Sequence, residues 1–192
     1  MSRLFGTDGV RGIANSELNC EVAHKIGLAA ASLIKHEIQR TPKILIGKDT
    51  RISGDMLEAA IASGLCSAGA EVILLGVIPT PAVAFLTRKY EADAGFVISA
   101  SHNSAEYNGI KIFNSNGYKL SDEYEDEIEK IVKGDRKITE LPTGDEVGTI
   151  TRCKTAIYDY AAFAKSIFEG NLEGMKIAVD CADGAASETA VR

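Results

Sequence analysis

Apolar residues in the first half of the chain follow two spacings in turn, which indicates alternating helices and strands. Recurrence every three or four residues predicts helices over about 20–39 and 54–67, and a third helix opens at Thr80-Pro81, where proline suits the first turn. Unbroken apolar runs predict strands at 43–48, 71–75 and 94–100. Because these strands are apolar throughout, we expect an α/β fold with a mixed, mostly parallel sheet and helices on both faces.

The pattern changes after residue 100. Apolar runs at Ile110–Phe113 and Tyr118–Leu120 flank Asn114-Ser115-Asn116-Gly117, and an Asn-Gly pair between apolar runs is typical of a hairpin turn. We therefore expect one antiparallel edge strand. Ser121, followed by acidic residues, predicts a capped helix that ends near residue 133.

The remaining chain predicts a change of domain. Residues 135–153 are polar and have no strong period, so they are expected to form a loop or a weak hairpin. A helix at about 155–168, a strand at Lys176–Cys181 and a final helix would begin another α/β unit. We predict one complete domain at residues 1–152 and the incomplete start of a second at 153–192.

The composition is that of a folded, soluble chain: of 192 residues, 45% are hydrophobic and 25% are charged. Lys and Arg number 21 against 27 Asp and Glu, and this net charge of −6 argues against binding to nucleic acid. No apolar run approaches the length that spans a bilayer, about 20 residues, and the first residues lack the apolar core of a secretion signal. We therefore expect a cytoplasmic protein without membrane contact, whose four separated cysteines are free thiols.

The densest candidate chemistry follows the strand predicted at 94–100. Ser101, His102 and Asn103 lie where ligands bind in parallel α/β sheets, just beyond the carboxyl end of a strand. Ser101 could act as a nucleophile or carry a covalent group, and Lys111, returning along the next strand, could transfer a proton or hold a phosphate. His102 could do either. The alternative is that these are ordinary loop residues with local turn hydrogen bonds.

Two further loops could approach an anion. The glycine-rich segment Phe5–Gly12 carries Arg11, and the segment Gly47–Ser53 carries Lys48 and Arg51 just before a helix N-terminus. The alternatives are a structural turn and a capped helix start with solvated basic side chains. Neither segment has the spacing of a common nucleotide-binding loop, and no G-x-S-x-G motif supports a serine hydrolase.

Together, the segments FGTDGVRG, GKDTRISG and ISASHNSAEYNGIK resemble the N-terminal domain of the α-D-phosphohexomutases. The resemblance extends over essentially all 192 residues, including IPTPAVAFLT and VDCADGAAS. The FGTDG opening is similar to the branch of this family that acts on hexosamine phosphates.

The resemblance implies an isomerase that interconverts glucosamine 6-phosphate and glucosamine 1-phosphate for amino-sugar and cell-wall precursor synthesis. It implies a phosphoserine enzyme, a 1,6-bisphosphate intermediate, and glucosamine 1,6-bisphosphate as activator. One Mg²⁺ ion is expected, with the phosphate on Ser101 as one ligand. The expected partner is a small phosphosugar, and a homodimer is compatible with the family.

Residue roles also follow from the resemblance. Ser101 matches the phosphoryl-carrying serine, and Lys111 matches the proton-transferring lysine. His102 and Arg11 match residues around the phosphoserine. Arg51 and Asn103 are the supporting, phosphate-binding residues.

The sequence departs from the family pattern in three respects. Ser104 replaces a usual proline, which removes a constraint on φ, and Asp183 stands where asparagine is more frequent. The Asp-x-Asp-x-Asp metal loop, the sugar-specificity loop and the C-terminal phosphate-binding loop of the family are missing. We therefore predict that these 192 residues do not turn over substrate alone.

Two alternatives remain at this stage. One is a mutase of the same family that acts on hexose phosphates. The other is a non-catalytic phosphosugar-binding module, which would use Arg11 and Arg51 and be indifferent to Ser101 and Lys111.

Overall fold

A computed structural model describes residues 3–192. Its strands are β1 (Val10–Ile13), β2 (Lys43–Lys48), β3 (Glu71–Val77), β4 (Ala94–Ile98), β5 (Tyr107–Asn114) and β6 (Thr149–Arg152). Its helices are α1 (Cys20–Ile38), α2 (Gly54–Ser67), α3 (Thr80–Lys89), α4 (Asp122–Lys133) and α5 (Ala156–Ser166), with a 3₁₀ turn at Gly144–Glu146. Within residues 3–192, no helix is long and apolar enough to cross a membrane.

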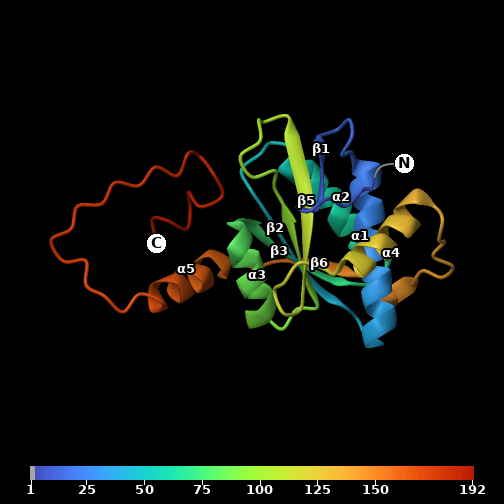
Figure 1. The fold of residues 1–192 in the computed structure, drawn as a ribbon. Helices are drawn as coiled ribbons and strands as arrows, with labels where there is room; N and C mark the ends of the chain where they lie inside the picture. The colour runs from blue at the N-terminus through green and yellow to red at the C-terminus, as the bar shows by residue number, and fades with distance from the viewer. Residues whose placement is uncertain (1–2) are drawn as a thin grey trace.

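The strands form one six-stranded sheet in the order β1-β5-β4-β2-β3-β6. Figure 1 shows α3 on one side of this sheet and α1 and α4 on the other. β2 pairs in parallel with β3 and β4, and β6 pairs in parallel with β3. β5 runs antiparallel to β4 and to β1. The mixed, mostly parallel sheet predicted from the apolar runs is therefore confirmed.

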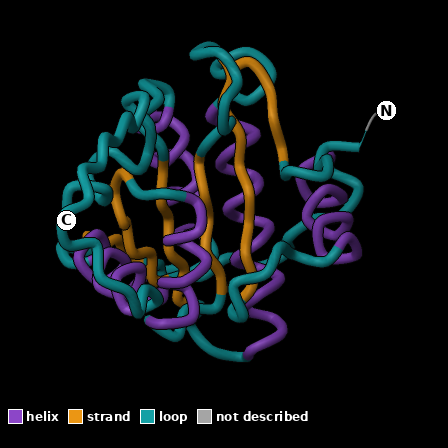
Figure 2. The backbone as a smooth tube through the Cα atoms, turned by 60° about the vertical axis from the view of Figure 1, so that its left-hand side comes forward, coloured by secondary structure: helices purple, strands orange, loops and turns teal. Residues whose placement is uncertain are grey.

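Helices cover both faces of the sheet (Figure 2). α1, α2 and α4 pack on one face around fully buried residues such as Ile26, Ile61 and Phe96. α3 packs on the other face around Leu45, Val83 and Leu86, where α5 also begins. This two-layer burial explains why the central strands are apolar on both sides.

Close helix contact explains two glycines in the first layer. A Cβ on Gly64 of α2 would lie 2.1 Å from the carbonyl oxygen of His24 in α1, and one on Gly27 would lie 2.5 Å from that of Ile61. α1 and α2 therefore pack with their backbones in direct contact.

Asn19 caps α1 as the sequence predicts, since its Oδ1 accepts a hydrogen bond from the Val22 amide at 3.0 Å.

The antiparallel part differs in detail from the hairpin prediction. Residues 118–120 contribute only one bridge, between Phe113 and Lys119, and form no strand. The outer partner of β5 is instead β1, from the glycine-rich opening, for which the sequence predicts an anion-approaching loop or a structural turn. Ser121 caps α4, its Oγ accepting from the Tyr124 amide at 3.3 Å.

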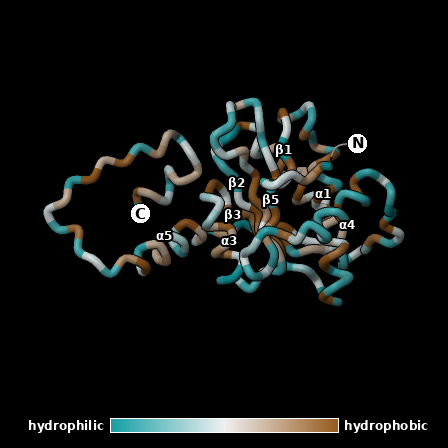
Figure 3. Tube along the Cα trace, viewed as in Figure 1, coloured by the Kyte–Doolittle hydropathy of each residue, from teal (hydrophilic) through white to brown (hydrophobic). Residues whose placement is uncertain are grey.

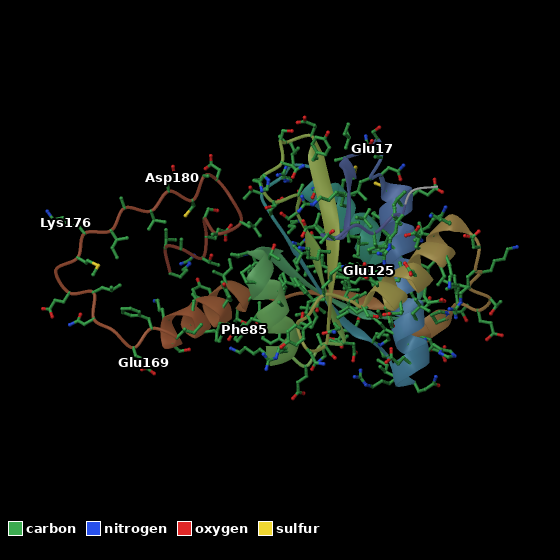
Figure 4. The ribbon with its side chains drawn as sticks, viewed as in Figure 1. Glu17, Phe85, Glu125, Glu169, Lys176 and Asp180 are labelled. Atoms are coloured by element: carbon green, nitrogen blue, oxygen red, sulfur yellow. The ribbon has the colours of Figure 1, made fainter. Side chains whose placement is uncertain are left out.

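Three expectations for the last third of the chain are wrong. The predicted loop or weak hairpin at 135–153 contains β6, which pairs with β3. Residues 176–181 form no strand, and turns replace the final helix. The extended segment after α5 carries Glu169, Lys176 and Asp180 away from the sheet (Figure 4) and then returns toward it. Among the strands of residues 3–192, none pairs with residues 176–181, so the backbone of this segment makes no ladder hydrogen bonds with them. The domain boundary after residue 152 stays a prediction.

Candidate active site

The candidate site lies where β2 and β4 end. These strands pair in parallel with Lys48 opposite Ile98, so the segments that follow them emerge side by side. The first segment leads through Asp49 and Arg51 into α2, and the second is the serine loop, residues 99–106. The Asp49 amide donates to the Ile98 carbonyl oxygen at 3.0 Å, which joins the starts of both segments.

Ser101 is exposed on the serine loop in an unusual backbone conformation. Its φ of 57° lies in the left-handed region, which non-glycine residues seldom adopt. The Ser101 amide donates to Ser99 Oγ at 3.0 Å, and Ser101 Oγ lies 3.3 Å from His102 Nδ1. The hydroxyl thus lies beyond the end of β4, beside an imidazole, and strained backbone of this kind is frequent at functional sites.

The antiparallel strands bring the opening of the chain to this loop. β1 pairs with β5 so that Arg11 stands opposite Gly109, and Lys111 lies two residues further along β5, on the same face. Arg11 Nη1 donates to Asn103 Oδ1 at 3.2 Å. A Cβ on Gly109 would lie 2.7 Å from the Ser99 carbonyl oxygen, so the absent side chain permits this close approach.

Asp8 holds the two cations together. Its carboxylate lies 3.3 Å from Lys111 Nζ and 3.5 Å from Arg11 Nη2. The hydrogen bond from Lys111, with the charges of Lys111 and Arg11, lowers the pKa of Asp8. Contacts therefore run from Lys111 through Asp8 and Arg11 to Asn103 in the serine loop.

The guanidinium group of Arg51 donates five hydrogen bonds to acceptors within this chain. Its terminal nitrogens donate to four backbone carbonyl oxygens at 2.6 to 3.0 Å, those of Ser101, Asn103, Ser104 and Tyr107. Its Nε donates to Asp49 Oδ2 at 3.1 Å. A guanidinium has five N–H groups, so none is left for a substrate phosphate. This geometry favours a positioning role over the phosphate-binding role expected from the sequence.

The neighbouring Lys48 is also neutralised within the chain. Its Nζ lies 2.6 Å from Asp55 and 2.6 Å from Glu58, and only 13% of its side chain is exposed. Lys48 is therefore neither solvated nor directed toward the space where a ligand phosphate could bind. Among the basic residues described at this site, Arg11 and Lys111 are more exposed, at 31% and 27%, and keep N–H groups that can donate to a phosphate.

An open cavity of about 840 Å³ adjoins the serine loop. Thr50 Oγ1 donates to the Asp183 carbonyl oxygen at 2.6 Å, so the returning C-terminal segment forms one wall. The N-terminus of α3 at Thr80 forms another, and the N–H groups and positive dipole of a helix N-terminus favour an anion. Its lining comprises Asp49–Ile52, Pro79–Pro81, Ser99, Ser101–Asn103, Ala105 and Ala182–Ala185.

The described residues fit only part of a metal site. Within residues 3–192, no three His, Cys, Asp or Glu side chains are grouped so that they could hold an ion. Asp49 is paired with Arg51, and Asp8 is paired with Lys111 and Arg11. A divalent cation at Ser101 would need further oxygen ligands beyond those that this part of the chain offers.

Sequence reasoning did not single out two carboxylates that organise the site. Asp8 lies within FGTDG, just before a glycine, and Asp49 precedes Arg51 by two residues. Asp49 Oδ1 accepts from the Arg51 amide at 3.0 Å, the pattern of an Asx turn. That spacing was a readable signal, whereas the role of Asp8 depends on the distant Lys111.

The chain resembles known proteins along its whole length. The family described as phosphoglucomutase/phosphomannomutase, alpha/beta/alpha domain I, matches residues 2–139. The phosphoglucosamine mutase of Clostridium acetobutylicum is 60% identical over 192 residues, which are 100% of this chain and 43% of that protein. That of Acetivibrio thermocellus is 57% identical over 190 residues, 99% of this chain and 42% of that protein. The chain thus spans less than half the length of these relatives.

Solved structures give the same result for the fold. A putative phosphomannomutase from Thermus thermophilus superposes with a TM-score of 0.71 at 26% identity, over 88% of this chain and 37% of that one. A phosphoglucomutase/phosphomannomutase family protein from Burkholderia thailandensis gives 0.67 at 26% identity, over 84% and 35%.

Proposed function

Since the chain belongs to the phosphoglucomutase/phosphomannomutase family, we propose that it is the phosphoryl-carrying part of an enzyme that interconverts glucosamine 6-phosphate and glucosamine 1-phosphate. The observation that carries the proposal is Ser101, exposed at a φ of 57° on the wall of an open cavity. The hexosamine phosphate is favoured because the relatives with 57–60% identity are phosphoglucosamine mutases.

The proposed reaction moves one phosphoryl group at a time. The Oγ–P bond of phosphorylated Ser101 breaks as a sugar hydroxyl oxygen bonds to phosphorus, giving the 1,6-bisphosphate. The proton lost by that hydroxyl passes through Lys111 to Ser101 Oγ. After the bisphosphate reorients, Ser101 attacks its other phosphoryl group and the proton returns. The sugar leaves as the isomer, and the enzyme is again phosphorylated.

The surrounding side chains support the transfer by charge and position. Arg11 offers N–H donors to the phosphoryl oxygens, and Asn103 fixes it by accepting one hydrogen bond. Asp8 holds the ammonium group of Lys111 beside Arg11 by accepting its hydrogen bond. His102 lies beside Ser101 Oγ and can share its proton.

We also propose Mg²⁺ and glucosamine 1,6-bisphosphate as cofactor and activator. Mg²⁺, with the Ser101 phosphate as one ligand, would neutralise charge on the phosphoryl group. The working protein is proposed to act in the cytoplasm on a small phosphosugar, without nucleic acid or membrane, and a homodimer is its proposed assembly. The net charge of −6 supports the absence of a nucleic-acid partner.

The test is to map phosphorylation by mass spectrometry after incubation with Mg²⁺ and glucosamine 1,6-bisphosphate. We expect phosphate on Ser101 and none on Ser99, Ser104 or Ser115, which are internal controls on the same and a neighbouring segment. Ser101→Ala in the full-length protein should reduce mutase activity by at least about 10³-fold, because the covalent carrier is lost.

Two results would contradict the proposal. One is a folded full-length protein that stays unphosphorylated at Ser101. The other is full activity in Ser101→Ala. Faster turnover of glucose or mannose 1-phosphate than of glucosamine 1-phosphate would keep the mechanism and correct the substrate.

A further inference from the structure

The backbone conformation at Ser101 must be held by tertiary contacts, because the serine loop has no regular secondary structure to hold it. Ser101 is in the left-handed region at a φ of 57°, and residue 104 is a serine, whose φ no ring restricts. A phosphoryl carrier must nevertheless return to the same place after each transfer, since a displacement of about 1 Å can cost about 100-fold in rate.

Three carbonyl groups of the loop point at a single side chain. Those of Ser101, Asn103 and Ser104 each accept from Arg51, as does that of Tyr107, where β5 begins. Converging carbonyl dipoles repel one another unless a cation lies between them. Other hydrogen bonds, such as that from the Asn103 amide to the Ala100 carbonyl oxygen, shape single turns of the loop. The guanidinium joins three of the loop carbonyls to one another and to the start of β5.

Arg51 is itself anchored to the sheet. Its side chain is 11% exposed, and both its amide and its Nε donate to the buried Asp49. The Asp49 amide in turn donates to the Ile98 carbonyl oxygen at the end of β4. The connection from the central strands to the serine loop is therefore made of charge-assisted and backbone hydrogen bonds.

We infer that Arg51 is a positioning residue for the phosphoryl-carrying serine, which it holds through four loop carbonyls without binding the substrate's phosphate. The inference rests on the proposed function of Ser101 and deepens it. It separates the two arginines of the site, since Arg11 is left to face the phosphate.

The experiment uses the full-length protein with Arg51→Lys and Arg51→Ala. Lysine keeps the charge but has three donors on one nitrogen, too few for four carbonyls and a carboxylate. We expect kcat to fall about 100-fold in both variants, with KM for glucosamine 1-phosphate within about twofold. Added guanidinium ion should restore part of the kcat of Arg51→Ala and none of that of Arg51→Lys, whose side chain still fills the site.

Arg40→Lys is the matched control. Arg40 also makes a two-pronged ion pair, with Asp93 at 2.7 and 2.9 Å, but it lies just before the start of β2, at the other end of the strands, and is 58% exposed. Its kcat and KM should equal those of the parent protein. Thermal unfolding and the ³¹P NMR signal of the Ser101 phosphate would show that each variant is folded and loaded.

The outcomes separate this inference from the proposed function. A raised KM with unchanged kcat would show that Arg51 binds the substrate's phosphate, and a parental kcat in Arg51→Lys would show that the loop holds itself. Either result overturns the inference and leaves the function of Ser101 intact. Activity that survives Ser101→Ala would overturn the proposed function instead. If Arg51→Ala does not fold, Arg51→Lys decides by the same kcat and KM criteria.

Discussion

Two segments with similar local sequence adopt different structures in this protein. KILIGK at residues 43–48 is β2, between β3 and β4 in the middle of the sheet, whereas KIAVDC at 176–181 is irregular. Ile44 is 0% exposed and Ile177 is 61% exposed, although each follows a lysine in an apolar run. Figure 3 shows apolar colour in both the sheet and the extended segment. An apolar run therefore indicates a strand only where neighbouring strands and covering helices exist to bury it.

The largest difference between the two segments is expected from the same substitution made in each of them in the 192-residue chain. Ile44→Ala should lower the free energy of unfolding by about 2–5 kcal/mol, because it opens a cavity in the core beneath α1 and α2. Ile177→Ala should change it by less than about 0.5 kcal/mol, since the side chain is already in water. Urea unfolding followed by circular dichroism gives both values. Equal losses would mean that residues 176–181 are buried in solution.

A smaller loss of stability is expected from a substitution at the contact between α5 and α3, which joins the C-terminal segment to the helices on the sheet. Phe163 of α5 stacks on Phe85 of α3, with ring centroids 3.8 Å apart and planes at 15°. Phe163→Ala should cost about 1–2 kcal/mol, from the ring pair and the half-buried area. Phe168→Ala is the control, because Phe168 lies past α5 and is 55% exposed. Similar values for the two variants would contradict the docking of α5 on α3.

The smallest expected effect is on acid stability. The hydrogen bond from Lys89, followed by that from Tyr90, lowers the pKa of Asp159 in α5 from 3.8 to about 2. Because the folded-state pKa is depressed, this stabilisation is present above about pH 4 and is lost as the pH falls toward 2.

Tyrosine fluorescence, undisturbed because the chain has no tryptophan, can follow this loss during acid titration. Asp159→Asn should lower stability at neutral pH and flatten the curve between about pH 4 and 2. Lys89→Gln removes the largest cause and should move the acid transition to higher pH. Coincident curves for the parent and Asp159→Asn would rule out the contribution.

The sheet core was readable from the sequence because its signals are local. Apolar spacing and caps predicted α1, α2 and α4 to within a residue or so, and the run at 43–48 matches β2. β1 and β6 were missed because neither has a strong local pattern. β1 forms by pairing with β5, about a hundred residues later, and β6 forms by pairing with β3. Such strands depend on a partner that local spacing does not reveal.

For the site, the sequence identified the chemistry and the tertiary structure assigned the contacts. The position of Ser101 beyond a strand, with His102 beside it, followed from the order of elements and from resemblance. The different contacts of Arg11 and Arg51 did not, because in the sequence both are arginines in glycine-bearing segments. Only the count of hydrogen bonds at each guanidinium distinguishes them.

The alternation of elements, the motifs that carry the family resemblance and the serine at the end of β4 can be read from the chain alone, since each is a pattern of residues close together in sequence. Three features became visible only in the folded chain. Asp8 pairs with Lys111, the guanidinium of Arg51 donates its hydrogen bonds to the serine loop, and residues 176–181 form no strand. The physical reason is that hydrogen bonds and burial are properties of pairs of segments. A chain encodes its own propensities locally, but its pairings exist only once distant segments have met.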